Sequence, residues 1–265
     1  MMSDGKTIRL IRQGPVAKVV FCRPEVHNAF NDQVIDEMTL TMSKLKTDED
    51  IRVVVITGEG KSFCAGADLN WMGRVKEAEY EENLEESRRL ADLFWDIYSF
   101  PKPTIAQVNG AAIGGGTGFV AVTDVAVGAQ RAIFSFSEVK IGVVPACISP
   151  YVIKRVGEGR AREFFLTGER LTADRALQAG LINRVAPDDL LEATVTGMID
   201  SLLSSGPAAI AVCKELLQKV PGQTVPEFKE YTAEVIAKLR QSVEGQEGME
   251  AFLNKRKPNW VIDEE

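Results

Sequence analysis

A glycine-rich segment, NGAAIGGGTGF at residues 109–119, directly follows a strand-like run, PTIAQV at 103–108. Glycines between a strand and a helix leave backbone amides accessible, so such a segment can bind a phosphate, a dinucleotide or an oxyanion. A GxxxxGK[ST] phosphate loop is excluded because no lysine follows the glycines, and the dinucleotide pattern GxGxxG fails at Phe119 when counted from Gly114. Two interpretations remain, which are stabilisation of a negatively charged oxygen and close packing of a strand on a helix.

A second segment of small residues, GKSFCAGADLNWM at 60–72, follows another strand-like run, IRVVVITG at 51–58. Two separated segments that each present a backbone N–H can form a two-donor oxyanion hole for a carbonyl oxygen. One such donor contributes about 3 to 4 kcal/mol of transition-state stabilisation in other enzymes. The pair of segments therefore favours the oxyanion interpretation.

Glu138 lies in AIFSFSEVKIGVV (132–144), among Phe134, Phe136, Val139 and Ile141. Apolar surroundings raise the pKa of a carboxylate, which suits a group that carries protons near neutral pH. The alternative is an exposed glutamate on a strand whose residues alternate between two faces.

Histidine and cysteine chemistry is restricted in this chain. His27 is the only histidine, which excludes an HExxH zinc site. The four cysteines, Cys22, Cys64, Cys147 and Cys213, lack CxxC spacing and are expected to be reduced core thiols. Cys64 lies beside the second segment, but only His27 could activate it, so a cysteine nucleophile is disfavoured.

Length and charge set wider limits. The 265 residues, 45% of them hydrophobic, suffice for one large domain or a domain with an appendage. No apolar run approaches the roughly 20 residues of a membrane span, and MMSDGKTIRL has no secretory or transit pattern, so a cytoplasmic protein without membrane contact is expected. The net charge of −7 disfavours nucleic acid as a partner.

The elements that must position these segments alternate between strand and helix, which predicts an α/β fold. Strands are expected at 16–23, 51–58, 103–108 and 125–129, with a helix of about ten residues after the glycine segment. A helix over 31–46 should bury Val34, Met38, Met42 and Leu45. A helix over 80–100, stopped by Pro101 and Pro103, should bury the face formed by Leu84, Ala91, Phe94, Trp95 and Tyr98.

From about residue 159 the pattern becomes helical. Helices are expected within 171–180, 188–205, 207–219 and 226–241. Thr172 and Pro207 are start signals for two of them. The sequence therefore predicts an α/β body followed by a helical C-terminal region.

Four motifs in this order and spacing resemble the enoyl-CoA hydratase/isomerase family, the crotonases: RPEVHNAF, ITGEGKSFCAGADL, KPTIAQVNGAAIGGGTG and FSFSEVKIGVVP. With LTGERLTADRALQAGLINRVAP, the resemblance runs from about residue 10 to 187. It implies a spiral of ββα units over residues 1–200 and a helical trimerisation region over 201–265. It further implies a homotrimer or homohexamer that acts on an acyl-CoA, with no cofactor or metal beyond the coenzyme A of the substrate.

The resemblance also assigns roles to residues. It places the oxyanion amides at Ala67 and Gly115 and the catalytic carboxylate at Glu138. Substrate contacts are expected at Asn28, Ala29, Ala65, Asp68, Leu69, Gly114 and Gly118. A helix cap fits the Asp68 side chain equally well, a tight turn fits Asn28 and Ala29, and Trp71 and Met72 fit either an acyl pocket or the core.

One position departs from the family pattern. Many hydratases of this family carry a second glutamate, where this chain has Gly118. The resemblance is nearest to bacterial members that hydrate branched, carboxylated enoyl-CoA thioesters such as 3-methylglutaconyl-CoA, in leucine or isoprenoid breakdown. Loss of the second glutamate would free volume for a substrate carboxylate, with Lys140, Arg155 or Arg131 as the receiving cation.

Three alternatives to a hydratase stay open at this point. An enoyl-CoA isomerase needs only one carboxylate and the same oxyanion hole. A non-catalytic subunit would keep the fold without turnover. An RNA-binding module would need basic runs interleaved with aromatic residues, which this acidic sequence lacks.

Overall fold

The computed structural model describes residues 7–261, which form two compact units. Unit 1 extends to Phe100 and resumes over Thr104–Thr196, and unit 2 comprises Pro101–Pro103 and the chain from Gly197 onward. Residues 1–6, part of the segment expected to lack a leader pattern, and the last four residues of the predicted C-terminal region lie outside the described part.

The larger sheet of unit 1 has six strands in the order β1-β2-β3-β5-β7-β10. Its strands are β1 (Ile8–Gln13), β2 (Val16–Phe21), β3 (Val53–Gly58), β5 (Thr104–Val108), β7 (Val125–Ala129) and β10 (Arg184–Ala186). β1 and β2 form an antiparallel hairpin, and every later pairing is parallel. Four of these strands fall where the sequence predicts them, with ends shifted by up to two residues.

The smaller sheet has four strands of three residues each, in the order β4-β6-β8-β9. They are β4 (Ser62–Cys64), β6 (Ala111–Ile113), β8 (Ile133–Ser135) and β9 (Arg170–Thr172). β4, β6 and β8 are parallel neighbours, and β9 is antiparallel to β8. The sequence pattern does not predict them, because three residues are too few to show a periodicity.

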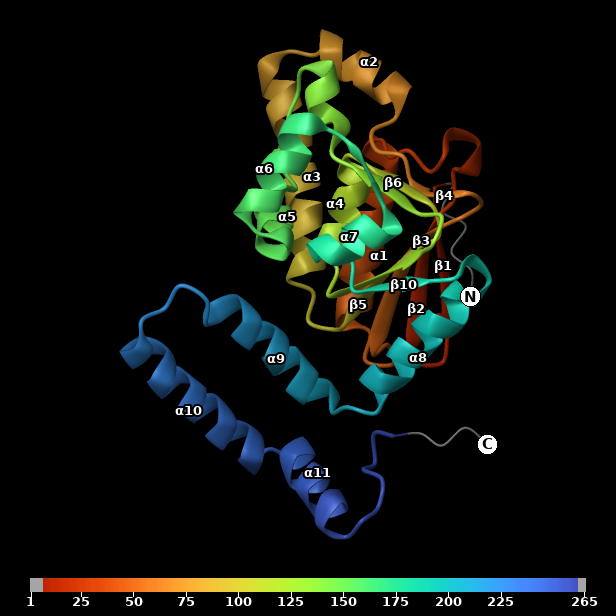
Figure 1. The fold of residues 1–265 in the computed structure, drawn as a ribbon. Helices are drawn as coiled ribbons and strands as arrows, with labels where there is room; N and C mark the ends of the chain where they lie inside the picture. The colour runs from red at the N-terminus through yellow and green to blue at the C-terminus, as the bar shows by residue number, and fades with distance from the viewer. Residues whose placement is uncertain (1–6, 262–265) are drawn as a thin grey trace. The chain divides into compact units, whose positions relative to one another are not determined.

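Successive segments repeat one unit, which is a strand in the larger sheet, a strand in the smaller sheet and one or more helices (Figure 1). The helical parts of the three repeats are α2 (Leu69–Glu77) with α3 (Tyr80–Tyr98), α4 (Gly115–Val122), and η2 (Ser137–Ile141) with α5 (Ser149–Val156) and α6 (Glu158–Thr167). This succession is the predicted spiral of ββα units, so the fold class is confirmed.

The other helical segments of unit 1 precede or follow the repeats. They are η1 (Pro24–Val26), α1 (Asp32–Thr47), α7 (Ala173–Ala179), η3 (Asp188–Leu190) and the first part of α8 (Leu191–Leu203). Asn31 caps the N-terminus of α1, and its side chain accepts a hydrogen bond from the Val34 amide. The four residues predicted to form its apolar stripe are all buried, as expected.

The predicted buried face of α3 is correct in part: Phe94 is buried and Leu84, Ala91 and Tyr98 are half-buried, but the prediction for Trp95 is wrong. Leu93, Phe94 and Ile97 are its buried residues, whereas the Trp95 side chain is 52% exposed. Tyr98 is half-buried and packs its ring against Tyr151 of α5. Because tryptophan is large and amphipathic, its presence in a helix does not decide which face meets the core.

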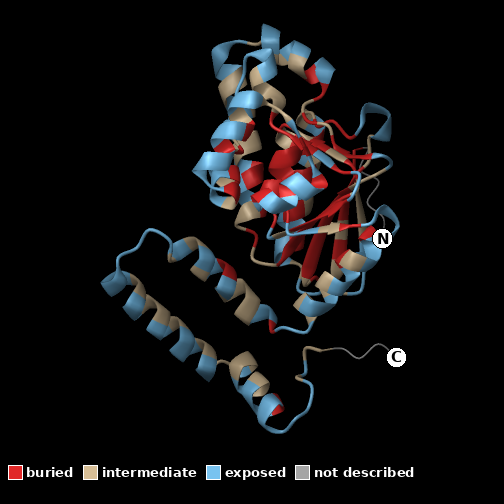
Figure 2. Cartoon of the chain, viewed as in Figure 1, coloured by how far each residue is buried: buried red, intermediate tan, exposed pale blue. Residues whose placement is uncertain are grey.

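α4 lies at the centre of the core of unit 1. All of its residues from Gly116 to Val122 are buried, and the Phe119 ring contacts those of Phe21, Phe30 and Phe94. Figure 2 shows the buried residues gathered along the sheets and the central helix, with exposed residues on the outer helices. A helix that is apolar on all sides is expected at such a position.

Unit 2 contains α9 (Pro207–Lys219), α10 (Val225–Gln241) and α11 (Val243–Leu253). The Glu244 carboxylate of α11 accepts hydrogen bonds from the amides of Ala208 and Ala209, so it caps the N-terminus of α9. Most residues of this unit are exposed or half-buried (Figure 2). The predicted trimerisation role of residues 201–265 stays a prediction.

Within residues 7–261, no single helix is both long and apolar enough to span a bilayer. Only the bent pair Asp188–Leu203 and Pro207–Lys219 passes that test when length and composition of both helices are taken together.

Candidate active site

Three candidate groups follow the carboxyl ends of three neighbouring parallel strands. Ala67 lies three residues after β4, Gly115 two residues after β6, and Glu138 three residues after β8. Because β4, β6 and β8 are parallel and adjacent, their carboxyl ends lie at one edge of the smaller sheet. The topology therefore gathers the three groups, and ligands in α/β proteins commonly bind at such an edge.

The Ala67 amide is held by a single parallel bridge to Phe30. The Phe30 N–H donates to Gly66 O, and the Asp68 N–H donates to Phe30 O, both at 2.8 Å. In a parallel bridge a residue bonds to the two neighbours of its partner, so the N–H of Ala67 points to the other side. No protein acceptor for this N–H lies within residues 7–261.

The Gly115 amide is the first of α4, with Gly114 as the preceding cap residue. The first N–H groups of a helix have no partner within the helix, and they lie at the positive end of its dipole. In the described chain the Gly115 N–H has no other acceptor. A Cβ at position 115 would lie 2.7 Å from Phe30 Cε1, so Phe30 lies against both amide-bearing segments.

Backbone crowding explains the glycines of the two segments. A Cβ on Gly66 would lie 2.8 Å from Ile113 O, and a Cβ on Gly116 would overlap the Cys64 carbonyl. The loop after β4 therefore touches the backbone at the end of β6, and the start of α4 touches the backbone at the end of β4. Only glycine permits this approach, which brings the Ala67 and Gly115 regions together.

The Glu138 carboxylate lies against the turn that begins α4. A Cβ on Gly114 would lie 3.1 Å from Glu138 Oε1, and Gly114 has a φ of 55°. Glu138 Oε2 is buried and has no hydrogen-bond partner in the described residues. Burial raises the pKa of this carboxyl group, and only a bond from its own backbone amide opposes the shift.

The surroundings of Glu138 differ in one respect from the sequence-based expectation. Phe134 and Phe136 are fully buried, as expected, whereas Ile141 is exposed. Ile141, at the end of η2, is therefore not part of a buried apolar environment, contrary to the expectation. The result is a carboxylate whose pKa is raised, so it holds a proton more readily than an ordinary glutamate does.

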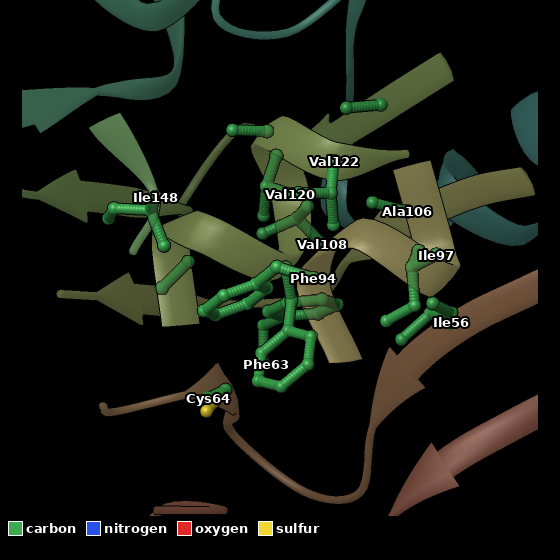
Figure 3. Close-up of a cluster of buried hydrophobic side chains, with 14 of the residues drawn as sticks. Ile56, Phe63, Cys64, Phe94, Ile97, Ala106, Val108, Val120, Val122 and Ile148 are labelled. Atoms are coloured by element: carbon green, nitrogen blue, oxygen red, sulfur yellow. The ribbon is translucent and has the colours of Figure 1, made fainter. Parts of the chain in front are cut away.

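The freed volume expected at Gly118 is not present. A Cβ at this position would overlap Ile148 Cγ2 and would lie 3.1 Å from Phe94 Cζ. Figure 3 shows Ile148 and Phe94 in the same buried cluster as Val120 and Val122 of α4. The space above Gly118 is thus filled by apolar side chains, and a substrate carboxylate has no place there.

The residues around position 28 build a turn. Asn28 has a φ of 57°, and its buried amide donates to Glu59 O at 2.9 Å and to Ser62 O at 2.8 Å. Its carbonyl oxygen accepts from the Arg23 amide. Ala29 is buried beside it. Because the Asn28 side chain makes three hydrogen bonds to backbone groups, it stabilises this turn.

The remaining predicted substrate residues differ in exposure. Ala65 is half-buried, and the Leu69 side chain is 84% exposed. Asp68 is buried and caps α2 by accepting from the amides of Asn70 and Trp71. Trp71 packs in the core, with its ring centroid 5.6 Å from that of Phe30.

Two of the three cations proposed to receive a substrate carboxylate have other partners. Arg155 is directed at the C-terminus of α4, where it donates to the carbonyls of Val120, Ala121, Thr123 and Asp124. Arg131 donates to Asn109 O and forms an ion pair with Asp188. Lys140 is exposed, and its side chain passes Gly168, so it is the candidate that remains.

The cysteines are only partly the core thiols that were expected. Cys64 is buried, and burial raises the pKa of its thiol to about 12. Cys22 and Cys147 are half-buried, and Cys213 is exposed. Across residues 7–261 no group of three or more His, Cys, Asp or Glu side chains is arranged to hold a metal ion.

Sequence reasoning missed three residues that shape this site, namely Arg23, Phe30 and Ile148. Arg23 and Phe30 are the first and last residues of the motif RPEVHNAF. The charge of Arg23 and the apolar ring of Phe30 could have marked both as candidates. Nothing in the sequence links Ile148 to Gly118, because Ile148 precedes α5 and Gly118 belongs to α4, and the two residues meet only through packing.

Known proteins resemble this chain over most of its length. Residues 12–262 match the family model described as enoyl-CoA hydratase/isomerase. The chain is 32% identical over 250 residues to the 2,3-dehydroadipyl-CoA hydratase of Escherichia coli, which covers 94% of this chain and 96% of the relative. It is 33% identical over 218 residues to an enoyl-CoA hydratase of Alternaria alternata, covering 82% and 71%. The crystal structure of an enoyl-CoA hydratase from Shewanella pealeana superposes with a TM-score of 0.94 at 40% identity, covering 97% of each chain.

Proposed function

This chain belongs to the enoyl-CoA hydratase/isomerase family, and from that premise we propose that it adds water across the α,β double bond of an acyl-CoA thioester. The observation that carries the proposal is the position of the Glu138 carboxylate against Gly114, next to two backbone amides that have no protein acceptor in the described chain. One group that moves protons and two that stabilise a developing oxyanion are what hydration of a conjugated thioester requires.

The proposed reaction uses Glu138 twice. Its carboxylate takes a proton from water as the water oxygen bonds to the β-carbon, and the electron pair of the double bond moves toward the thioester carbonyl. The N–H groups of Ala67 and Gly115 stabilise the enolate oxygen. Protonated Glu138 then gives its proton to the α-carbon, which restores the thioester and the carboxylate.

An isomerase is the second candidate, and one observation favours it. Ile148 and Phe94 make the space above Gly118 apolar, so no second carboxylate lies there to orient a water molecule. Moving a double bond requires one carboxylate and the oxyanion donors, but it requires no water.

Incorporation of solvent oxygen separates the two reactions. We expect the product of crotonyl-CoA formed in H₂¹⁸O to gain one ¹⁸O atom at the β-carbon, measured by mass spectrometry. Turnover of a 3-enoyl-CoA without ¹⁸O in the product, together with no reaction of crotonyl-CoA, would establish the isomerase instead.

For the acyl group we propose a branched, carboxylated enoyl-CoA such as 3-methylglutaconyl-CoA. A relative at 32% identity is named for 2,3-dehydroadipyl-CoA, whose acyl chain also ends in a carboxylate. Lys140, two residues beyond Glu138, is the cation assigned to that carboxylate. Since Ile148 and Phe94 fill the space at Gly118, the assignment places the substrate carboxylate on the side of η2, where Lys140 lies.

Replacing Lys140 tests this assignment. Lys140→Ala should raise KM for 3-methylglutaconyl-CoA by up to about fivefold and leave KM for crotonyl-CoA unchanged, because only the first substrate carries the second charge. Arg131→Ala is the matched control, since Arg131 already pairs with Asp188. Equal effects of Lys140→Ala on both substrates would contradict the assignment.

A further inference from the structure

We propose that Arg23 and Asp68 form a positioning pair that holds the Ala67 N–H as a hydrogen-bond donor to the thioester oxygen. The inference rests on the proposed function, because it concerns the oxyanion site of that reaction. Neither residue has to touch the substrate. The pair connects the segment that contains Phe30 to the segment that contains Ala67, and this position indicates its role.

Arg23 joins both sides of the Phe30–Ala67 bridge. One guanidinium nitrogen donates to Ala29 O at 2.6 Å, directly before Phe30, and the other donates to Asp68 Oδ2 at 2.8 Å, directly after Ala67. The bridge itself is a single pair of residues outside any longer ladder. Arg23 therefore supplies the neighbouring bonds that a longer strand pairing would otherwise supply.

Asp68 connects Ala67 to the helix that follows. Its second oxygen, Oδ1, accepts from the amides of Asn70 at 2.8 Å and Trp71 at 3.3 Å, which fixes the start of α2. Its own N–H donates to Phe30 O. The bridge restrains the peptide between Gly66 and Ala67, which carries the Ala67 N–H, because Gly66 O accepts from Phe30. The cap and the ion pair fix Asp68 directly after it.

The pair is enclosed by protein. The side chains of Arg23 and Asp68 are 18% and 5% exposed. Burial alone would raise the pKa of Asp68, but hydrogen bonds from Arg23 and from the two capping amides hold it below the ordinary range of aspartate. Both carboxylate oxygens already accept bonds from protein donors, so the side chain offers nothing to a substrate and its function lies in holding the loop.

The kinetic consequence differs from that of a binding residue. A displaced oxyanion donor weakens an interaction that strengthens in the transition state, so kcat and kcat/KM should fall together while KM changes little. A residue that only binds coenzyme A would raise KM. A residue that only stabilises the fold would lower the melting temperature and leave kcat unchanged for the folded fraction.

The test compares Asp68→Asn, Asp68→Ala, Arg23→Lys and Arg23→Gln. We expect kcat for crotonyl-CoA hydration to fall by about 10- to 100-fold in Asp68→Ala and Arg23→Gln, less than the full loss of a donor. Asp68→Asn keeps a capping oxygen and Arg23→Lys keeps a charge, so both should lose less. The kcat of the double variant Arg23→Gln/Asp68→Asn should be only slightly lower than that of the more impaired single variant, because the pair acts as a unit.

Asp32→Asn is the matched control. Asp32 of α1 accepts from Arg74 of α2 at 2.8 Å, so the substitution removes an ion pair from the same helix without touching Asp68. It should leave kcat unchanged. If Asp68→Ala does not fold, Asp68→Asn and Arg23→Lys are compared with the wild type instead.

An infrared measurement reports on the donor directly. Binding of butyryl-CoA labelled with ¹³C at the thioester carbonyl should lower the C=O stretching frequency in the wild type, and this shift should shrink in folded Asp68→Asn and Arg23→Gln. An unchanged shift with unchanged kcat would overturn the positioning role while leaving the hydratase intact. A wild type that neither binds butyryl-CoA nor hydrates crotonyl-CoA would overturn both.

Discussion

The Glu138 carboxylate has a cost to folding that its proposed role explains. One of its oxygens is buried without a hydrogen-bond partner in the described chain, and burial raises its pKa. A buried polar group without a partner destabilises a fold by about 1 to 3 kcal/mol. Proteins retain such groups mainly at functional sites, where the same surroundings set the pKa needed for proton transfer.

Replacement of Glu138 should therefore stabilise the protein, and more so at high pH. Since burial raises the folded-state pKa, the protonated form is favoured in the fold, and stability is lost as pH rises through that pKa. Glu138→Gln should raise the free energy of unfolding by about 1 kcal/mol at pH 8. The gain should shrink as pH falls toward 5, as measured by urea unfolding.

The control for this measurement is Glu49→Gln, because Glu49 is exposed. It should change the free energy of unfolding little at either pH. A Glu138→Gln protein that is less stable than the wild type at pH 8 would show that the carboxylate has partners that stabilise it.

At the scale of elements, the site depends on how closely α4 approaches β4. The start of α4 touches the backbone of the strand end at Cys64, and this contact brings the Gly115 amide next to the loop that carries Ala67. A helix N-terminus at such a position presents both free N–H groups and a favourable dipole. The approach leaves no space for side chains on the facing residues.

Gly116→Ala should abolish this approach. The added Cβ would overlap the Cys64 carbonyl, a backbone atom that cannot move aside, so the expected loss of stability is at least about 3 kcal/mol. Gly159→Ala in α6 is the matched control, since nothing lies within 4 Å of its Cβ, and it should gain up to about 1 kcal/mol. Thermal unfolding of both proteins compares the two, and equal stability would contradict the close contact.

The packing above Gly118 is testable by a double-mutant cycle. Gly118→Ala should cost about 1 to 3 kcal/mol through overlap with Ile148, and Ile148→Ala about 2 to 5 kcal/mol through the cavity it leaves. In the double variant the new methyl group enters that cavity, so the total should be smaller than the sum by about 0.5 to 3 kcal/mol. Strict additivity in urea unfolding would show that the two residues do not meet.

The sequence predicts those elements whose pattern is long enough to show a period. The apolar stripe of α1 and the continuous apolar run of β3 are examples. The strands of the smaller sheet carry three residues each, and Trp95 shows that one large side chain does not define the buried face of α3. Local pattern therefore finds the large sheet, whereas the small sheet that arranges the site depends on tertiary pairing.

The site itself divides in the same way. The two small-residue segments and the Glu138 carboxylate in its apolar run stand out in the sequence, and the resemblance to the family selects Ala67 and Gly115 within those segments. Their gathering at one sheet edge follows from strands that the pattern does not show. The contacts of Arg23 and Ile148 join residues distant in sequence, and only the structure reveals them.

At the scale of the whole molecule, unit 2 has many exposed apolar side chains. Leu217, Ile236, Val243, Phe252 and Leu253 are between 46% and 89% exposed. Exposed apolar surface of this kind is typical of protein contact sites. It supports the prediction that residues 201–265 mediate assembly into a homotrimer or homohexamer.

Sedimentation equilibrium tests the assembly. The expected mass is three or six times the 29.0 kDa of the chain. Val243→Glu and Phe252→Glu should lower it, because each puts a charge at a side chain that assembly would bury. Leu40→Glu, at an exposed apolar position of α1, is the control and should leave the mass unchanged. A wild-type mass near that of one chain would contradict the prediction.

The central claim is that Glu138 is the group that moves protons at this site, and hydration kinetics test it most directly. Loss of the conjugated thioester absorbance of crotonyl-CoA should be followed for the wild type, Glu138→Gln and Glu49→Gln across pH 5 to 9. The account predicts that Glu138→Gln lowers kcat by about 10² to 10⁴-fold, that Glu49→Gln has no effect, and that wild-type activity falls on the acid side at a pH above the ordinary glutamate range, as the raised pKa of Glu138 requires. Turnover that is indifferent to the replacement of Glu138 would contradict it.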